Sequence, residues 1–122
     1  MQAPAQRVFK TPWFAKAAKT AGITDKELCE VAEELTKGQG TDLGGNVWKK
    51  RLDKNRHRGI VANKVGERWI FVFLFAKNDR ENIEKDELKG FKRLAKDYGK
   101  LKPAEIDRLV KDGELLEICH GC

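Results

Sequence analysis

The stretch that most constrains how this chain can fold is the apolar run Trp69–Phe75. It reads Trp-Ile-Phe-Val-Phe-Leu-Phe, without a polar residue and rich in β-branched and aromatic side chains. A run of this length between turn residues predicts a strand buried on both faces, near the middle of a sheet. Gly66-Glu67, just upstream, predicts a two-residue hairpin loop, so residues 58–65 should pair antiparallel with the run.

Helix signals surround this predicted sheet. A short strand is expected at 7–10, and Thr11 followed by Pro12 predicts a helix over 12–20. The capping-box pattern Thr24-Asp25-Lys26-Glu27 predicts a second helix, with Leu28, Val31, Ala32 and Leu35 on its apolar side. The glycine-rich residues 38–45 predict a connecting loop. Further along, we expect a helix over 81–98 capped by Asn78 or Asp79, a short helix over 104–111, and an edge strand over 115–118.

These elements predict an α+β fold in which a small antiparallel β-sheet is packed by an N-terminal αα-hairpin and a C-terminal helix. The 122 residues are long enough for one domain with a real core and too short for two ordinary ones. We therefore expect a single domain over residues 1–122, with a short helix and tail at about 103–122.

Basic residues gather in the segment Trp48–Arg58, which holds six Lys or Arg and one Asp in a chain of net charge +6. Side chains alternate along a strand, so Lys49 and Arg51 should share one face while Trp48 and Leu52 face the helices. The hairpin should then bring Arg58 opposite Lys49 and Arg51. A solvated surface explains any one of these cations, but three converging on one sheet face indicate an anionic partner such as nucleic acid.

Other chemistry is sparse in this sequence. No serine or cysteine triad and no carboxylate cluster for a two-metal site can be argued from the spacings, so phosphodiester chemistry would be metal-free. His57 and His120 are the only histidines. No apolar run is long enough to span a membrane, and residues 1–6 lack the features of a signal peptide, so a cytoplasmic protein is expected.

The three cysteines are Cys29, Cys119 and Cys122, an odd number that argues against a disulfide framework. Cys29 falls on the apolar side of the second helix and is expected to behave as a small hydrophobic residue. Cys119 and Cys122 have the spacing of metal or redox pairs. Because a zinc site normally wants four ligands and no second pair is visible, we expect an exposed tail, with a metal or redox pair as the alternative.

Three segments together resemble the RelE/ParE superfamily of toxins from bacterial type II toxin–antitoxin modules, in particular its RelE/HigB-like branch. They are Lys49-Lys50-Arg51-Leu52, His57-Arg58-Gly59-Ile60-Val61 and the more specific Phe73-Leu74-Phe75-Ala76-Lys77-Asn78-Asp79-Arg80-Glu81-Asn82-Ile83. The resemblance extends from Arg7 to about Ile118. It implies a fold like that of microbial ribonucleases and the activity of a ribosome-dependent mRNA endonuclease that inhibits translation.

In the implied mechanism the 2′-hydroxyl attacks the neighbouring phosphate without metal, giving 2′,3′-cyclic phosphate and 5′-hydroxyl ends. The implied partners are a cognate antitoxin, the ribosome and mRNA, with no membrane and no small-molecule cofactor. By position, Lys49 and Arg51 match the family's paired basic residues, and Arg58 matches its phosphate-binding arginine. Residues expected to contact RNA are Lys50, Lys54, Arg56, Lys77, Asn78 and Arg80.

The chain departs from the family pattern at two places. Asn55-Arg56-His57-Arg58 replaces the usual turn ending in Tyr-Arg, and Glu84 stands roughly where a base-stacking tyrosine is expected. His57 is therefore a fourth candidate catalytic residue, whose neutral imidazole would take the 2′-hydroxyl proton. The alternatives are that His57 caps the loop or stacks on a base. A ParE-like toxin that poisons gyrase and a catalytically inactive RNA-binding co-regulator remain as alternative functions.

Overall fold

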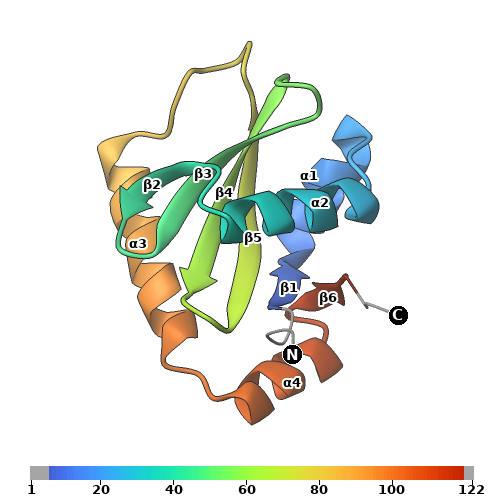
Figure 1. Cartoon of the computed structure of the whole chain (residues 1–122), viewed down its shortest axis with the longest axis vertical. Helices are drawn as coiled ribbons and strands as arrows, with labels where there is room; N and C mark the ends of the chain where they lie inside the picture. The colour runs from blue at the N-terminus through green and yellow to red at the C-terminus, as the bar shows by residue number, and fades with distance from the viewer. Residues whose placement is uncertain (1–5, 120–122) are drawn as a thin grey trace.

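The computed structural model describes residues 6–119, whose strands and helices are drawn in Figure 1. In chain order the elements are β1 (Arg7–Lys10), α1 (Pro12–Ala21), α2 (Asp25–Thr36), β2 (Thr41–Gly44), β3 (Val47–Leu52), β4 (His57–Lys64), β5 (Arg68–Ala76), α3 (Lys85–Gly99), α4 (Pro103–Lys111) and β6 (Leu116–Ile118). The predicted α+β class is confirmed, and so is the position of the apolar strand as β5.

The strands form one six-stranded sheet in the order β2-β3-β4-β5-β1-β6. All neighbours are antiparallel except β1 and β5, which run parallel. β5 thus lies between β4 and β1 inside the sheet, which explains why its sequence has no polar side. The expected edge strand near the C-terminus is confirmed as β6, which pairs with β1.

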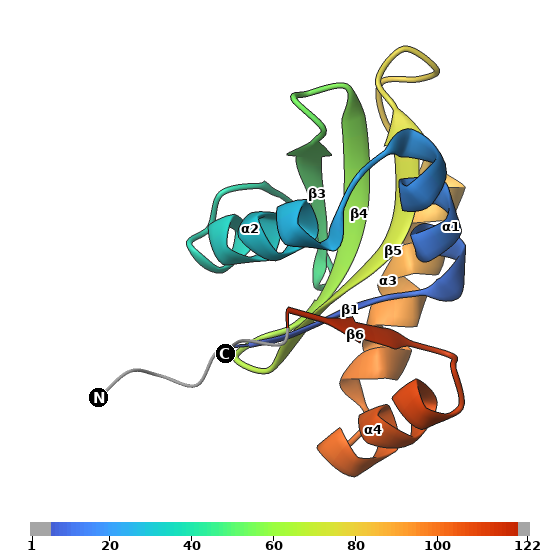
Figure 2. The same ribbon diagram turned by 90° about the vertical axis from the view of Figure 1, so that its right-hand side faces the viewer.

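Helices cover both faces of the sheet, as Figure 2 shows, and two separate cores result. On the side of α1 and α2, Phe14, Leu28 and Leu35 pack with Trp69 and Phe71. On the side of α3 and α4, the packed residues include Phe9, Val47, Ile60, Ile70 and Ile106. Each such side chain contributes about 1.5–3 kcal/mol when it is fully buried.

The helix starts predicted for α1 and α2 are confirmed by their caps. The Thr11 hydroxyl accepts a hydrogen bond from the Phe14 N–H at 3.1 Å, and the Thr24 hydroxyl accepts one from the Glu27 N–H at 3.2 Å. α1 ends at Gly22, whose φ of +76° is a conformation that glycine adopts without strain.

Three predicted boundaries are wrong. Residues 41–44 are not a loop but the edge strand β2, in which Thr41 pairs with Lys49. Gly45 and Asn46, with φ of 60° and 63°, form the two-residue turn that folds β2 onto β3. The β4–β5 turn has three residues, because Lys64 pairs with Arg68. α3 begins at Lys85 rather than at 81, because Glu84 and Glu87 form the capping box that starts it.

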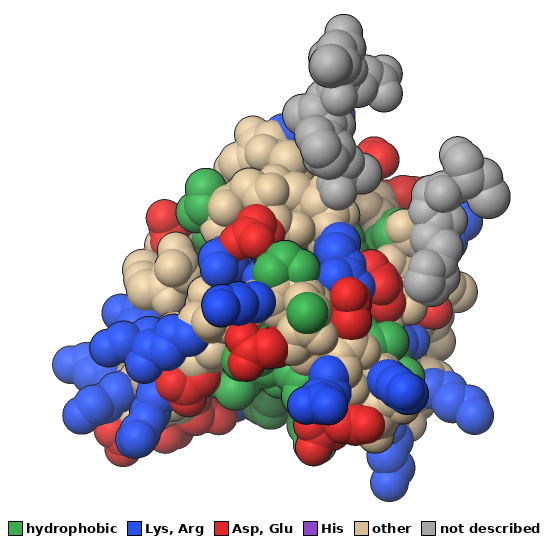
Figure 3. Space-filling view, turned by 90° about the horizontal axis from the view of Figure 1, so that it is seen from below, with side chains coloured by type: hydrophobic (Ala, Val, Ile, Leu, Met, Phe, Trp, Pro, Cys, Tyr) green, Lys and Arg blue, Asp and Glu red, His purple; other side chains and the backbone are tan. Residues whose placement is uncertain are grey.

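The end of the molecule formed by α4 carries acidic and basic side chains interspersed, with small apolar patches between them (Figure 3). Charge there is mixed, as on an ordinary solvated surface. Of the helices in residues 6–119, none has the length and apolar character needed to cross a membrane.

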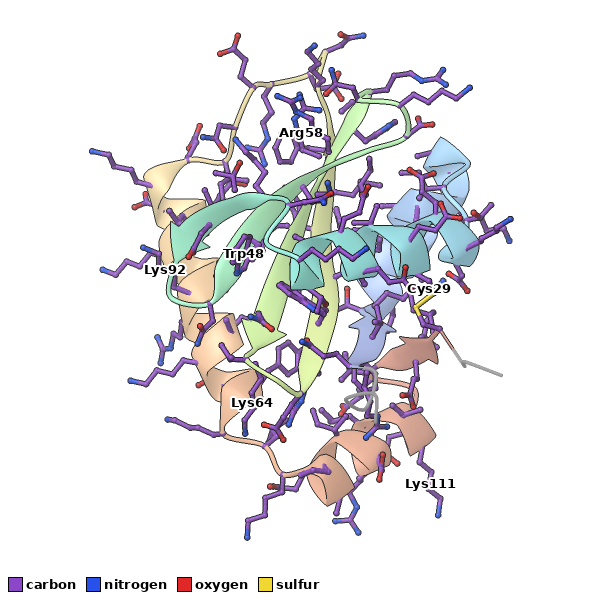
Figure 4. All side chains as sticks on the ribbon, in the orientation of Figure 1. Cys29, Trp48, Arg58, Lys64, Lys92 and Lys111 are labelled. Carbon is purple, nitrogen blue, oxygen red and sulfur yellow. A yellow bond between two sulfur atoms is a disulfide. The ribbon has the colours of Figure 1, made fainter. Side chains whose placement is uncertain are left out.

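The expectation that the cysteines form no disulfide is wrong. Cys29 on α2 is bonded to Cys119, just after β6, with a Cα–Cα distance of 5.5 Å (Figure 4). The odd cysteine count could not reveal this pair, because α2 and β6 are distant in sequence and meet only through the core that Leu28 and Ile118 share. Cys122, the other cysteine of the C-x-x-C spacing, lies outside the described residues.

Candidate functional site

The β3–β4 hairpin positions the cationic residues predicted from the sequence. Trp48 and Leu52 face the α1/α2 core, so the alternate residues Lys49 and Arg51 point to the opposite face, the one that α3 partly covers. On β4, Arg58 is the direct cross-strand partner of Arg51. The predicted meeting of these three cations is therefore seen in the structure.

The three cations line one cavity of about 170 Å³, together with Thr41 of β2 and Glu81 of the loop before α3. Figure 4 shows Arg58 at the end of the sheet where the β3–β4 turn and that loop both project. Within residues 6–119, none of the three forms an ion pair with a carboxylate. Like charges placed directly across a strand pair are destabilising. The cavity is thus arranged to receive an anion.

Hydrogen bonds hold two of these side chains in place. Arg58 donates from Nη1 to the carbonyl oxygens of Asn55 and His57, both at 3.1 Å, which fixes the guanidinium against the turn. Lys49 donates from Nζ to Asn82 Oδ1 at 3.3 Å. No such bond restrains the exposed Arg51 within the described chain, so its guanidinium can adjust to a ligand.

A β-bulge shapes the wall beside Arg58. Ile60 pairs with Phe73 and Val61 with Phe71, so Val72 is left without a partner across the strands. The extra residue reverses the alternation of β5 beyond this point. As a result Phe73 and Phe75 join the α3 side, and Phe75 lies directly opposite Arg58.

The structure does not bring His57 to this cavity. It precedes Arg58 on β4, pairs with Leu52, and its Nδ1 lies 3.1 Å from Asp53 Oδ2. Consecutive strand residues point to opposite faces, so His57 and Arg58 point away from each other. A catalytic role for His57 stays a prediction.

The turn between β3 and β4 has an unusual backbone. Asp53, Lys54 and Asn55 all have positive φ, at 53°, 51° and 73°. This conformation costs an ordinary residue such as Lys54 about 1–2 kcal/mol, whereas aspartate and asparagine adopt it more readily. The Glu27 carboxylate offsets part of this by accepting the Asp53 N–H, and Arg56 N–H donates to the Asp53 carbonyl at 3.0 Å. The Glu27 side chain therefore stabilises the β3–β4 turn and does not complete the capping box predicted at the start of α2.

The six predicted RNA-contact residues divide into two groups. Lys50 pairs with Glu34 of α2 at 3.2 Å, and Arg80 makes a two-pronged pair with Glu87 at 2.7 and 2.8 Å. Both are thus engaged with carboxylates of the same chain. The exposed members of the set are Lys54, Arg56, Lys77 and Asn78. The Lys77 N–H donates to the Arg56 carbonyl at 2.8 Å, so the two exposed segments lie side by side.

Arg80 anchors the loop before α3. Its guanidinium lies 5.3 Å from the ring centre of Phe73 and 5.2 Å from that of Phe75. The hydrogen bonds with Glu87 raise the pKa of Arg80 and lower that of Glu87. Arg80 thus fixes the loop to both the sheet and the first turn of α3.

Sequence reasoning missed Thr41, Glu81 and Asn82 as neighbours of the cations. It assigned Thr41 to an irregular loop, and Glu81 and Asn82 to the start of a helix. The true start of α3 uses Glu84 where serine, threonine, asparagine or aspartate is the usual signal. No local pattern therefore distinguished loop residues 81–84 from the helix.

Comparison with known families agrees with this geometry. The chain matches, over residues 6–118, the family model described as the RelE toxin of the RelE/RelB toxin–antitoxin system. No individual curated protein matches the chain. Because the family match extends from before β1 to the end of β6, this protein belongs to the RelE toxin family.

Proposed function

We propose that this toxin is a ribosome-dependent mRNA endonuclease that inhibits translation in the cytoplasm. The observation that carries the proposal is the cavity in which Lys49, Arg51 and Arg58 converge without carboxylate partners. Guanidinium groups bind phosphate oxygens through paired N–H donors, which makes arginine well suited to a phosphodiester. The antitoxin that belongs with a RelE toxin would neutralise this activity.

In the proposed reaction the 2′-oxygen of one nucleotide attacks the adjacent phosphorus. The O2′–P bond forms and the P–O5′ bond breaks, leaving a 2′,3′-cyclic phosphate and a 5′-hydroxyl. Arg51 and Arg58 bind the non-bridging oxygens and stabilise the negative charge that grows on them. Lys49, directed by Asn82, donates a proton to the departing 5′-oxygen.

The RNA strand is proposed to approach along the turn and loop that flank the cavity. Lys54 and Arg56 on the β3–β4 turn, and Lys77 and Asn78 after β5, are exposed at this end of the sheet. Contacts to phosphates position a strand without reading its sequence. Lys50 and Arg80 are held by carboxylates at 3.2 and 2.7 Å, whereas Arg56 lies 3.6 Å from Asp53 and its side chain is exposed. We therefore assign the RNA contacts to Lys54, Arg56, Lys77 and Asn78.

The test is cleavage of mRNA on programmed ribosomes by the purified toxin, with the ends of the fragments mapped. Arg58→Ala should lower the cleavage rate by about 10²–10³-fold, the effect typical of losing one donor to transition-state charge. Lys111→Ala removes a charge from exposed α4 at the far end of the molecule and serves as the matched control (Figure 4). It should cleave normally.

Equal cleavage by Arg58→Ala and the control would contradict the proposed site. Absence of cleavage by the unmodified toxin would contradict the proposed reaction itself. A gyrase supercoiling assay run in parallel would then test the alternative of a toxin that poisons gyrase.

A further inference from the structure

Glu81 is an acidic residue in a cavity otherwise lined by three cations and a threonine. The cationic lining suits a phosphate, but a carboxylate repels one, so phosphate binding alone does not explain Glu81. We infer that Glu81 is the catalytic residue that takes the proton from the attacking 2′-hydroxyl. This inference rests on the proposed function and adds to it the base that the cations do not provide.

The loop holds Glu81 in position from both sides. The preceding residue, Arg80, is bound by Glu87 and by the rings of Phe73 and Phe75. On the other side, Asn82 Oδ1 accepts hydrogen bonds from Lys49 Nζ at 3.3 Å and from the Ile83 N–H at 2.9 Å. The backbone of the exposed Glu81 is therefore held between an anchor on α3 and an anchor on β3.

Glu81 and the three cations do not form ion pairs with one another, which leaves room for a substrate between them. An ion pair would bring a carboxylate oxygen within 4.0 Å of a cationic nitrogen, and within residues 6–119 Glu81 forms no such pair. Glu81 instead lines the same 170 Å³ cavity as Lys49, Arg51 and Arg58. A phosphate with its neighbouring hydroxyl can enter such a space.

Chemical elimination among the lining residues also leads to Glu81. Lysine and arginine side chains are ordinarily protonated at neutral pH and cannot accept a further proton, and a threonine hydroxyl is a very weak base. His57, the only histidine among residues 6–119, lies on the opposite face of β4. A carboxylate is ordinarily ionised at neutral pH, so Glu81 is the group in this lining able to receive a proton.

The completed step balances. The Glu81 carboxylate takes the 2′-hydroxyl proton as the O2′–P bond forms. As the P–O5′ bond breaks, the Lys49 ammonium gives a proton to the 5′-oxygen. Solvent then restores both groups, so the net change is one proton moved from the 2′-oxygen to the 5′-oxygen.

The test compares Glu81→Gln with Asp79→Asn, which removes the same charge from an exposed position of the same loop. Glu81→Gln should lower the single-turnover cleavage rate at saturating ribosomes by about 10²–10⁴-fold, the usual contribution of a general base. Asp79→Asn should cleave normally. Thermal unfolding of both variants would verify that they fold.

A binding measurement separates a base from a residue that merely tunes charge. Ribosomes programmed with mRNA that carries 2′-deoxynucleotides can bind the toxin, but this mRNA has no hydroxyl to attack the phosphate. Glu81→Gln should bind these ribosomes with the same or higher affinity than the unmodified toxin, because the substitution removes a negative charge that repels the RNA and impairs only the chemical step. Loss of cleavage accompanied by equal loss of affinity would overturn the inference.

Two further outcomes separate this inference from the proposed function. Cleavage by Glu81→Gln at the rate of the unmodified toxin or faster, while Arg58→Ala is inactive, would overturn the role of Glu81 alone. Absence of cleavage by the unmodified toxin would overturn both.

Discussion

At the scale of single residues, the direction of each side chain decides its role more than its position in the sequence. Arg58 and His57 are neighbours in a basic segment, yet one lines the cavity and the other contacts Asp53 on the opposite face. Trp13 shows the same effect. It is a large aromatic residue of α1 but is 53% exposed, and its ring stacks on that of Phe73 with the ring centres 4.9 Å apart.

The contact between His57 and Asp53 yields a prediction about catalysis. Gln can still donate a hydrogen bond to the Asp53 carboxylate but cannot act as a base, so His57→Gln should cleave within about tenfold of the unmodified toxin. A loss of about 10²–10⁴-fold would instead support proton transfer by His57.

His57→Phe tests the turn itself. It removes the hydrogen bond to Asp53 beside a strained backbone, and we expect it to lower the free energy of unfolding by about 1–2 kcal/mol. Urea denaturation would measure this change, and unchanged stability would argue against a role for His57 in the turn.

At the scale of elements, the site is assembled from two connections in different parts of the chain, the β3–β4 turn and the loop between β5 and α3. The β3–β4 turn brings Arg51 and Arg58 together by register. The loop before α3 brings Glu81 and Asn82 to them, and it is held there by Arg80 and Glu87. The stability of that loop should therefore follow the ionisation of Glu87.

The pKa of Glu87 is lowered mainly by its hydrogen bonds with Arg80, and also by the Glu84 N–H that it accepts. A carboxylate with a lowered folded-state pKa stabilises the fold above its ordinary pKa, here 4.5, and this contribution disappears as the pH falls through the lowered value. Glu87→Gln should thus lower the melting temperature at pH 7, and the difference from the unmodified toxin should shrink as the pH falls below 4.5.

Melting curves of both proteins from pH 3 to 7 would measure this difference. Glu105→Gln, on exposed α4, controls for the loss of a negative charge at a helix start. A difference between Glu87→Gln and the unmodified toxin that stays constant down to the lowest pH would contradict the assignment.

At the scale of the whole molecule, the sheet has a core on each face, and the chain's first and last strands lie next to each other. β1 and β6 form one side of the sheet, where Arg7 pairs with Asp107 of α4 and with Glu117 of β6. The Cys29–Cys119 disulfide joins α2 to the residue after β6 across a sequence separation of 90. Both kinds of link hold the C-terminal segment against the N-terminal half.

Reduction of this disulfide should lower the free energy of unfolding by about 2–4 kcal/mol, because the link restricts the unfolded chain over a long loop. Denaturation with and without a thiol reductant would measure the difference, and Cys29→Ser should behave like the reduced protein. Equal stability in both states would contradict a stabilising role. In a reducing cytoplasm the thiols would be kept reduced and this contribution would be absent.

The sequence by itself determined the features that are encoded within a few residues. Thr11 and Thr24 start helices through their own hydroxyls, the run Trp69–Phe75 specifies a buried strand by composition, and alternation along β3 places Lys49 and Arg51 on one face. The hairpin rule then predicted the meeting of Arg51 and Arg58. Fold class, central strand and cationic cluster were predictable for this reason.

Only the tertiary structure decided the features that depend on contacts between distant segments. The parallel pairing of β1 with β5 and the Cys29–Cys119 bond both join residues that no local pattern relates. The same holds for Glu81, which the sequence pattern assigns to the start of a helix. In the structure Arg80 contacts Phe73, Phe75 and Glu87 and so holds the loop next to the cations. Local propensity differs little between a loop and a first helical turn, so packing against the sheet decides between them.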